Sequence, residues 1–420
     1  MALSRTSARP RSIPSRRSLA FIVSWRAPTP LRPLFSTPIQ PSQHRNLPTD
    51  WPTHSCDVDA EQLHHYCKGG YHPVHLGDSL NNGRYKILHK LGWGGYSTVW
   101  AARDTRNQTF VAIKIWVSEP THNSRELTAL RAIVTARSNR PGYQYLMTMQ
   151  DYFQIHGPNG THDYIITERL GPSVANFLDG YSGSVRLPGR LAKTIAKQTL
   201  SSLSFLHEHK IAHADLHTRN LAFTLPTSHE QDLLQKLGEP ETAPVRQTDR
   251  QPLEPNQPIY FVRPTAYPIN PKTPLYLNQT HRLRPSTLYI PLYYRAPEIL
   301  FNNTLNHRVD LWSMGCVLFE LITGQPPFDT FLITPPILVS QMLEMSGDTL
   351  PDCWQKQWYA INSKQLSDDE DRSFQSWLEQ DLSKEDIIRV GALVGSMIRL
   401  EPSARASVNT VLQDAWFQAS

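Results

Sequence analysis

The chain has 420 residues, a length that suits two or three small domains or one large two-lobed domain with a tail. Hydrophobic residues make up 39% of the chain, which is enough for a sizeable core. The formal net charge of +5 is small, and much of it lies at the N-terminus, so it does not indicate direct nucleic-acid binding. Four scattered Cys argue against a disulfide framework or a zinc site, and no apolar run is long enough to span a membrane.

The first 49 residues differ from the rest in composition. They contain eight Arg and no Lys, and the first acidic residue is Asp50. An Arg-rich, Ser-rich and acid-free composition is typical of a mitochondrial transit peptide, although several Pro would break its amphipathic helix. A disordered basic tail is the alternative. We expect residues 1–60 to lie outside the fold as one or the other.

A glycine-rich hairpin is predicted next. Residues 84–91 alternate like a strand and lead into Gly92-Trp93-Gly94-Gly95-Tyr96-Ser97-Thr98-Val99-Trp100. Glycines there let backbone amides approach phosphates, because no Cβ blocks them. Many hairpins contain glycines, so the strand Val111-Ala112-Ile113-Lys114 matters more, since its lysine is placed to pair with phosphates.

Such a lysine needs a carboxylate on the next helix. Residues 124–133 have helical periodicity with Glu126 in the first turn, whereas Glu119 precedes a proline, which disfavours helix. We expect Glu126 to be the partner; a solvated helix glutamate is the alternative. Residues 164–167 then predict a buried strand, and 168–172 break it, as a connector between two lobes would.

The stretch from His213 to Asn220 carries the candidate catalytic chemistry. It follows an amphipathic run, so the sequence predicts a helix ending in a loop that presents Asp215 and Asn220 five positions apart. In phosphoryl transfer a carboxylate accepts the proton of the substrate hydroxyl, and an amide oxygen on the same loop holds a metal ion. An Asp- and Asn-rich helix end is the alternative, and the rest of the chain must decide.

Later features occur in the order expected of the same interpretation. After a short strand at 221–223, residues 225–272 are rich in Pro, Gln and Asn and indicate a loosely ordered insertion. The signature Ala296-Pro297-Glu298 closes the activation segment of kinases. A helix is predicted from Asp310 to Leu321, and Arg405 is the candidate partner of Glu298.

From about Arg84 to Phe417 the chain resembles the eukaryotic protein kinase family, and within it the serine/arginine-rich-protein kinases in their fungal form. The resemblance rests on these motifs, on the position of the insertion, and on Tyr66-Cys67-Lys68-Gly69-Gly70-Tyr71-His72-Pro73-Val74, Leu91-Gly92-Trp93-Gly94 and Leu170-Gly171-Pro172-Ser173. It implies an α+β bilobal fold, with a β-rich N-lobe over residues 61–170 and a helical C-lobe over residues 171–420.

The resemblance also implies the roles of residues. Asp215 would be the catalytic base, Lys114 would orient the phosphates with help from Glu126, and Asn220 would bind Mg²⁺. The ATP site would comprise Leu91, Gly92, Gly94, Gly95, Val99, Ala112, Lys114, Glu168 and Leu170. The implied activity is phosphorylation of Ser in Arg/Ser-rich splicing proteins by a monomeric kinase of the cytoplasm and nucleus; the N-terminus leaves mitochondria open as the alternative.

Three departures from the family pattern stand out. Ala214 replaces the usual Arg after the catalytic His, as in close relatives, and His217 replaces a Lys, so its charge depends on its pKa. The metal-binding Asp-Phe-Gly is missing: no Asp or Gly occurs between Arg250 and Val309, and Asn278 could serve only as a neutral ligand. The chain is thus a pseudokinase, or it has lost a short piece at a wrong exon boundary.

An acidic run lies at residues 368–371, with the sequence Asp-Asp-Glu-Asp. The run could dock an arginine-rich substrate through charge pairing. The alternative is a solvated acidic loop without a partner.

Overall fold

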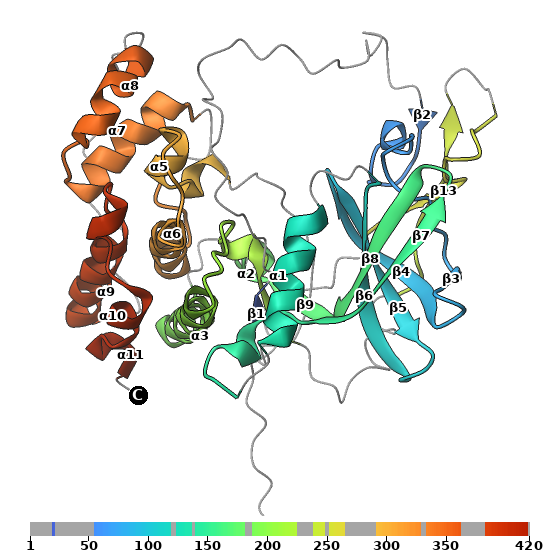
Figure 1. Cartoon of the computed structure of the whole chain (residues 1–420), viewed down its shortest axis with the longest axis horizontal. Coiled ribbons are helices and arrows are strands. Elements are labelled where there is room, and N and C mark those ends of the chain that lie inside the picture. The colour runs from blue at the N-terminus through green and yellow to red at the C-terminus, as the bar shows by residue number, and fades with distance from the viewer. Residues whose placement is uncertain are drawn as a thin grey trace, which may run out of the picture.

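A computed structural model describes residues 19–21, 54–118, 123–136, 139–180, 187–224, 238–247, 252–264, 291–328, 333–362 and 383–418. These residues form a sheet-rich half and a helical half (Figure 1). The predicted α+β bilobal architecture is therefore confirmed. Predictions for Glu119, Asn278 and the acidic run at 368–371 fall outside the described residues.

The small lobe is built on a six-stranded antiparallel sheet in the order β3-β4-β5-β6-β8-β7. Val111, Ile113 and Ile115 point to one face of β6 and join a buried cluster, so Ala112 and Lys114 point to the other face. The elements are β3 (Ser79–Leu80), β4 (Tyr85–Gly94), β5 (Ser97–Asp104), β6 (Thr109–Trp116), α1 (Asn123–Thr135), β7 (Met149–Gly157) and β8 (Gly160–Glu168).

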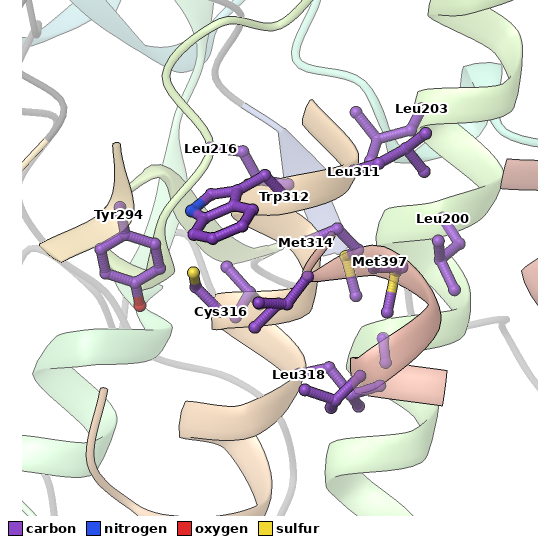
Figure 2. Packing of buried hydrophobic residues seen from close by; sticks show 14 of the residues in the cluster. Leu200, Leu203, Leu216, Tyr294, Leu311, Trp312, Met314, Cys316, Leu318 and Met397 are labelled. Carbon is purple, nitrogen blue, oxygen red and sulfur yellow. The ribbon is translucent and has the colours of Figure 1, made fainter. Parts of the chain in front are cut away.

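Helix α6 (Val309–Thr323) is the centre of the large lobe. It is apolar on nearly all sides, which is typical of a helix buried within a core. Figure 2 shows Leu200, Leu203 and Met397 of the flanking helices against it. The other helices are α2 (Val174–Gly180), α3 (Gly189–Glu208), α5 (Pro297–Leu300), α7 (Pro335–Ser346), α8 (Asp352–Asn362), α9 (Lys384–Met397), α10 (Val408–Leu412) and α11 (Ala415–Gln418).

Gly315 in the middle of α6 explains how closely the helices approach. A Cβ at this position would lie 2.7 Å from Cγ1 of Ile398, so no larger residue fits without a shift. None of the helices in the described ranges is long and apolar enough to cross a membrane. All four cysteines are free, as their spacing predicts.

Two segments predicted to lie outside the fold or to be loosely ordered contribute strands. From the N-terminal tail, β1 (Leu19–Phe21) pairs with β10 (Leu221–Thr224), which also pairs with β9 (Leu170–Ser173). The sheet-forming parts of the insertion are β11 (Thr242–Pro244), β12 (Arg246–Gln247) and β13 (Tyr260–Val262), and β12 pairs with β2 (His54–Ser55). The folded part therefore extends before residue 61, because pairing between distant segments leaves no trace in local composition.

The predicted pair Glu298–Arg405 is confirmed. The guanidinium donates through Nη1 to Oε1 and through Nη2 to Oε2 of Glu298, both at 2.7 Å, and both side chains are fully buried. Arg405 also donates to the carbonyls of Arg308, Arg399 and Leu400. The bridge ties the helix that follows the activation segment to the C-terminal part of the lobe.

Replacing Arg405 with Met tests the weight of this bridge. The variant leaves a buried carboxylate without its charge partner, so we expect the free energy of unfolding to fall by about 3–5 kcal/mol. Chemical denaturation measures the change. Arg140→Met is the control, because the side chains of its ion pair, Arg140 and Glu208, are 65% and 45% exposed. Loss of this exposed pair should lower the free energy of unfolding by less than about 1 kcal/mol. Equal losses in the two variants would contradict the expectation.

Candidate active site

The catalytic loop is held in place by Asp310, the second residue of α6. Its carboxylate accepts the backbone N–H groups of His213 (2.8 Å) and Ala214 (2.7 Å), and it bonds Nε2 of His207 (2.8 Å). Burial by itself would raise the pKa of Asp310, but the bond with His207, the nearby charges of His207 and His213 and the amide of Ala214 together outweigh burial and leave the pKa below its ordinary value. Asp310 is thus an ionised anchor within the core.

Ala214 has the left-handed φ of 60°, which costs a residue with a Cβ on the order of 1–2 kcal/mol. The bond from its amide to Asp310 offsets this strain. The loop bends at this position, and Leu216 packs into the core beside Trp312 (Figure 2). The backbone of Asp215, between Ala214 and Leu216, is therefore fixed from both sides.

Asp215 and Asn220 lie side by side, as their spacing predicts. The side-chain nitrogen of Asn220 donates to the backbone oxygen and to Oδ2 of Asp215, both at 2.8 Å. Both residues are buried, at the ends of a loop that closes with a single 3₁₀ turn over Thr218–Asn220. Because the amide nitrogen faces Asp215, the oxygen of Asn220 faces away from it.

His217 is neutral in this loop. Burial, with the nearby His213 and Arg219, lowers the pKa of His217 to about 3. Its Nδ1 accepts the N–H of Arg219 (3.2 Å), and its Nε2 lies 3.1 Å from Nδ2 of Asn220 and 3.7 Å from Oδ1 of Asp215. His217 therefore does not supply the positive charge of the lysine that it replaces.

Lys114 and Glu126 form the second half of the site. Nζ of Lys114 donates to both carboxylate oxygens of Glu126, at 2.7 and 2.8 Å, so the structure brings together the predicted pair. Burial lowers the pKa of Lys114, while Glu126 and, more weakly, Asp215 oppose that shift. The ammonium also lies 4.1 Å from the ring centroid of Trp116. A buried cation near Asp215 is suited to hold an anion such as a phosphate.

An apolar group next to Lys114 can receive a planar base. Leu91, Val99 and Ala112 form one buried cluster with Ala101, which the sequence analysis did not single out. Ala101 lies directly opposite Ala112 in the β5–β6 pairing, and two small side chains there leave room that larger ones would fill. The alternation along β5 could have revealed Ala101, because it is two positions from Val99 and shares its face.

Gly92, Gly94 and Gly95 lie where β4 turns into β5, beside this cluster. Gly95 is exposed, and a Cβ there would meet nothing within 4 Å, so space alone does not explain this glycine. Glycine leaves the backbone amides of the turn open to a ligand. This is consistent with a loop that covers phosphates.

The connector is more extended than predicted. Glu168 ends β8 and Leu170 begins β9, with one residue between them. Leu170 is buried with Ala222, two residues after Asn220, so it links the connector to the catalytic loop. Burial raises the pKa of Glu168, and the amide of Thr148 weakly opposes that shift.

The described residues do not fit a Mg²⁺ site of the usual strength. Mg²⁺ is held by one or two carboxylates together with substrate phosphates. The oxygen of Asn220 is neutral, and no group of three or more His, Cys, Asp or Glu suited to a metal occurs in the ranges that the structure describes. The carboxylate expected from Asp-Phe-Gly is also missing from the sequence between residues 250 and 309.

The fold and the site together define a protein kinase. The protein kinase domain family matches residues 85–233 and 276–417, which is more than half of the chain, and the chain belongs to this family. The two matched ranges are separated by most of the insertion. Members of the family generally use ATP and a divalent metal.

Individual kinases also match parts of this chain. SRSF protein kinase 3 of Homo sapiens is 36% identical over 173 residues, 40% of this chain and 30% of the relative. Protein kinase dsk1 of Schizosaccharomyces pombe is 34% identical over 190 residues, 44% of this chain and 34% of the relative. A serine/threonine protein kinase of Aspergillus fumigatus is 28% identical over 279 residues, 65% of this chain and 66% of the relative. The matches thus span about one third to two thirds of these relatives.

Lys114→Met tests the phosphate contact. The side chain keeps its length but leaves buried Glu126 without its partner, so we expect the fold to remain with a lower free energy of unfolding. The affinity for ATP should fall at least about tenfold, because a charge-assisted bond is lost. Calorimetric titration with ATP measures the affinity, and circular dichroism checks the fold. Lys86→Met is the control, because Lys86 is exposed on β4. Unchanged affinity in Lys114→Met would rule out the assignment.

Because position 214 is an alanine, we expect the activity not to require phosphorylation of the activation segment. An arginine in its place would pair with a phosphate on that segment, and alanine cannot. We expect protein treated with phosphatase to phosphorylate an Arg/Ser peptide as fast as protein treated with heat-inactivated phosphatase. Loss of activity only with active phosphatase would contradict this.

Proposed function

We propose that this chain is an ATP-dependent serine/threonine protein kinase of the SR-protein kinase type. One observation carries the proposal: Lys114 bonded to Glu126 and Asp215 bonded to Asn220 occur in one structure, on the elements where kinases carry them. An ordinary helix end or strand lysine accounts for neither pair.

The residues divide the chemistry between them. The cluster of Leu91, Val99 and Ala112 would hold the adenine, and the backbone of the connector at 168–170 would bond its edge. Lys114 would hold the phosphates. The Asp215 carboxylate, oriented by Asn220, would accept the proton of the attacking serine hydroxyl, which makes that oxygen a better nucleophile.

The substrate class follows from the relatives. SRSF protein kinase 3 is named as a kinase of SRSF proteins, and its likeness to this chain supports substrates of that kind. The resemblance to the serine/arginine-rich-protein kinases implies serine flanked by arginine as the target. A peptide of Arg-Ser repeats is the direct test. A peptide of Lys-Ser repeats is the matched control, because it keeps the charge and loses the planar guanidinium.

A second candidate is a pseudokinase that binds nucleotide and partners without turnover. The absence of Asp between residues 250 and 309 favours it. Thermal shifts separate the two candidates, since a ligand stabilises the state that it binds. A working kinase should need Mg²⁺ for its full shift with ATP, whereas a pseudokinase should show the same shift in EDTA.

The missing carboxylate predicts slow phosphoryl transfer. A neutral amide cannot replace the charge of an aspartate on the metal, and such a loss costs several kcal/mol of transition-state stabilisation, hence on the order of a thousandfold or more in rate. We expect a variant carrying Ile-Val-Asp-Phe-Gly in place of residues 274–278 to phosphorylate an Arg/Ser peptide faster by that factor. If the unmodified chain already works at an ordinary kinase rate, the aspartate is dispensable and the pseudokinase alternative is wrong.

A further inference from the structure

The described part of the insertion is a hairpin that packs on the small lobe. Strands β11 and β13 pair antiparallel, with Ala243 opposite Phe261. Figure 1 shows β13 and β2 together at the edge of the small lobe. Ala243 and Phe261 share a buried cluster with Tyr66 and Tyr71 of the lead-in that precedes the main sheet. The hairpin and the lead-in therefore form one unit.

Two asparagines join this unit to the sheet. Nδ2 of Asn256, in the hairpin, donates to the carbonyl of Tyr66 (3.2 Å) and to Oδ1 of Asn159 (3.0 Å) in the β7–β8 turn. Nδ2 of Asn159 donates to the carbonyls of Tyr71 (2.7 Å) and Asn256 (3.0 Å). Because Asn159 is fully buried, losing any one of these partners would leave polar groups unpaired.

A charged contact joins β4 to the lead-in. Nζ of Lys90 is buried, donates to Glu61 and lies 5.9 Å from the ring centroid of Phe261 in the hairpin. The hydroxyl of Tyr66 donates to the other oxygen of Glu61. The strand that leads into the glycine-rich loop is thus fixed to the hairpin and the lead-in four residues before Gly94.

Tyr71 extends this contact to the loop itself. Its hydroxyl donates to the backbone oxygen of Gly94, and the side chain is nearly fully buried, with its ring edge against Tyr66. Burial raises the pKa of Tyr71, so the phenol keeps the proton that it donates. On the other side of the turn, the carbonyl of Tyr96 accepts the N–H of Val117 (2.9 Å). The turn of the loop is therefore held at both ends.

We propose that Tyr71 is a positioning residue for the glycine-rich loop, and that the insertion hairpin holds Tyr71 in place. Glycine loses more conformational freedom on ordering than any other residue, so a loop of three glycines depends on outside contacts to keep one geometry. A loop held in this way presents its amides to the phosphates and loses little further conformational entropy when ATP binds. The proposal rests on the proposed function only in taking ATP as the ligand.

Hydrogen–deuterium exchange on the full chain, without nucleotide, tests the contact directly. Tyr71→Phe removes only the hydroxyl, and we expect the amides of residues 92–97 to exchange about fivefold faster, the effect of one lost hydrogen bond. Tyr152→Phe is the matched control, because Tyr152 lies on β7, at the opposite edge of the sheet from the loop, and loses a hydroxyl bond to Asp163 of β8. Unchanged exchange in Tyr71→Phe would overturn the proposal.

Asn256→Ala tests the part played by the hairpin. We expect the same amides to exchange about twofold faster, a smaller effect than that of Tyr71→Phe. Tyr71 keeps its bond to Gly94, but the bonds of Asn256 to Tyr66 and Asn159 are lost. Exchange equal to that of the wild type would overturn the role of the hairpin.

Ligand binding separates positioning from general destabilisation. Tyr71→Phe should weaken ATP about fivefold and leave adenosine unchanged, because adenosine has no phosphates for the loop to contact. Equal weakening of both ligands would overturn a role specific to the loop. If the wild-type chain binds neither ligand, the proposed function fails, and the exchange experiment still decides whether Tyr71 holds the loop.

Discussion

The carboxylate of Asp310 is the constraint on which the site depends. It is buried at the start of the central helix and accepts two consecutive backbone amides of the catalytic loop, one from a residue in a left-handed conformation. A buried carboxylate is costly unless it is paired, and here the loop and His207 pair it. The core of the large lobe and the geometry of the catalytic loop therefore stabilise each other.

The site contains both of its predicted side-chain pairs, but the chain lacks the expected metal-binding aspartate. The groups proposed to bind phosphate and to accept the proton are bonded and buried, through Lys114 with Glu126 and Asp215 with Asn220. The sequence has no Asp between residues 250 and 309 to hold a metal at the phosphates, and neutral His217 does not supply the charge of the lysine that it replaces. Electrostatic stabilisation is usually the largest single contribution to such catalysis. We therefore propose that this chain binds nucleotide more readily than it transfers phosphate.

The insertion shows why composition is a limited guide to order. Its Pro, Gln and Asn content indicates a loose segment, and the kinase family match passes over most of it. Even so, Phe261 and Asn256 are tied to the lead-in and to the β7–β8 turn. A few apolar side chains suffice to order a short hairpin when a preformed sheet supplies the rest of the buried surface.

The sequence by itself determined the lobes, the strand with Lys114, the helix before the catalytic loop and the partnership of Glu298 with Arg405. These follow from hydrophobic period and from motifs whose spacing is dictated by the chemistry. Only the tertiary structure decided that His217 is neutral, that Ala101 completes the apolar cluster, and that Tyr71 reaches Gly94. Each of these depends on burial or on contact between separate segments, which local periodicity does not encode.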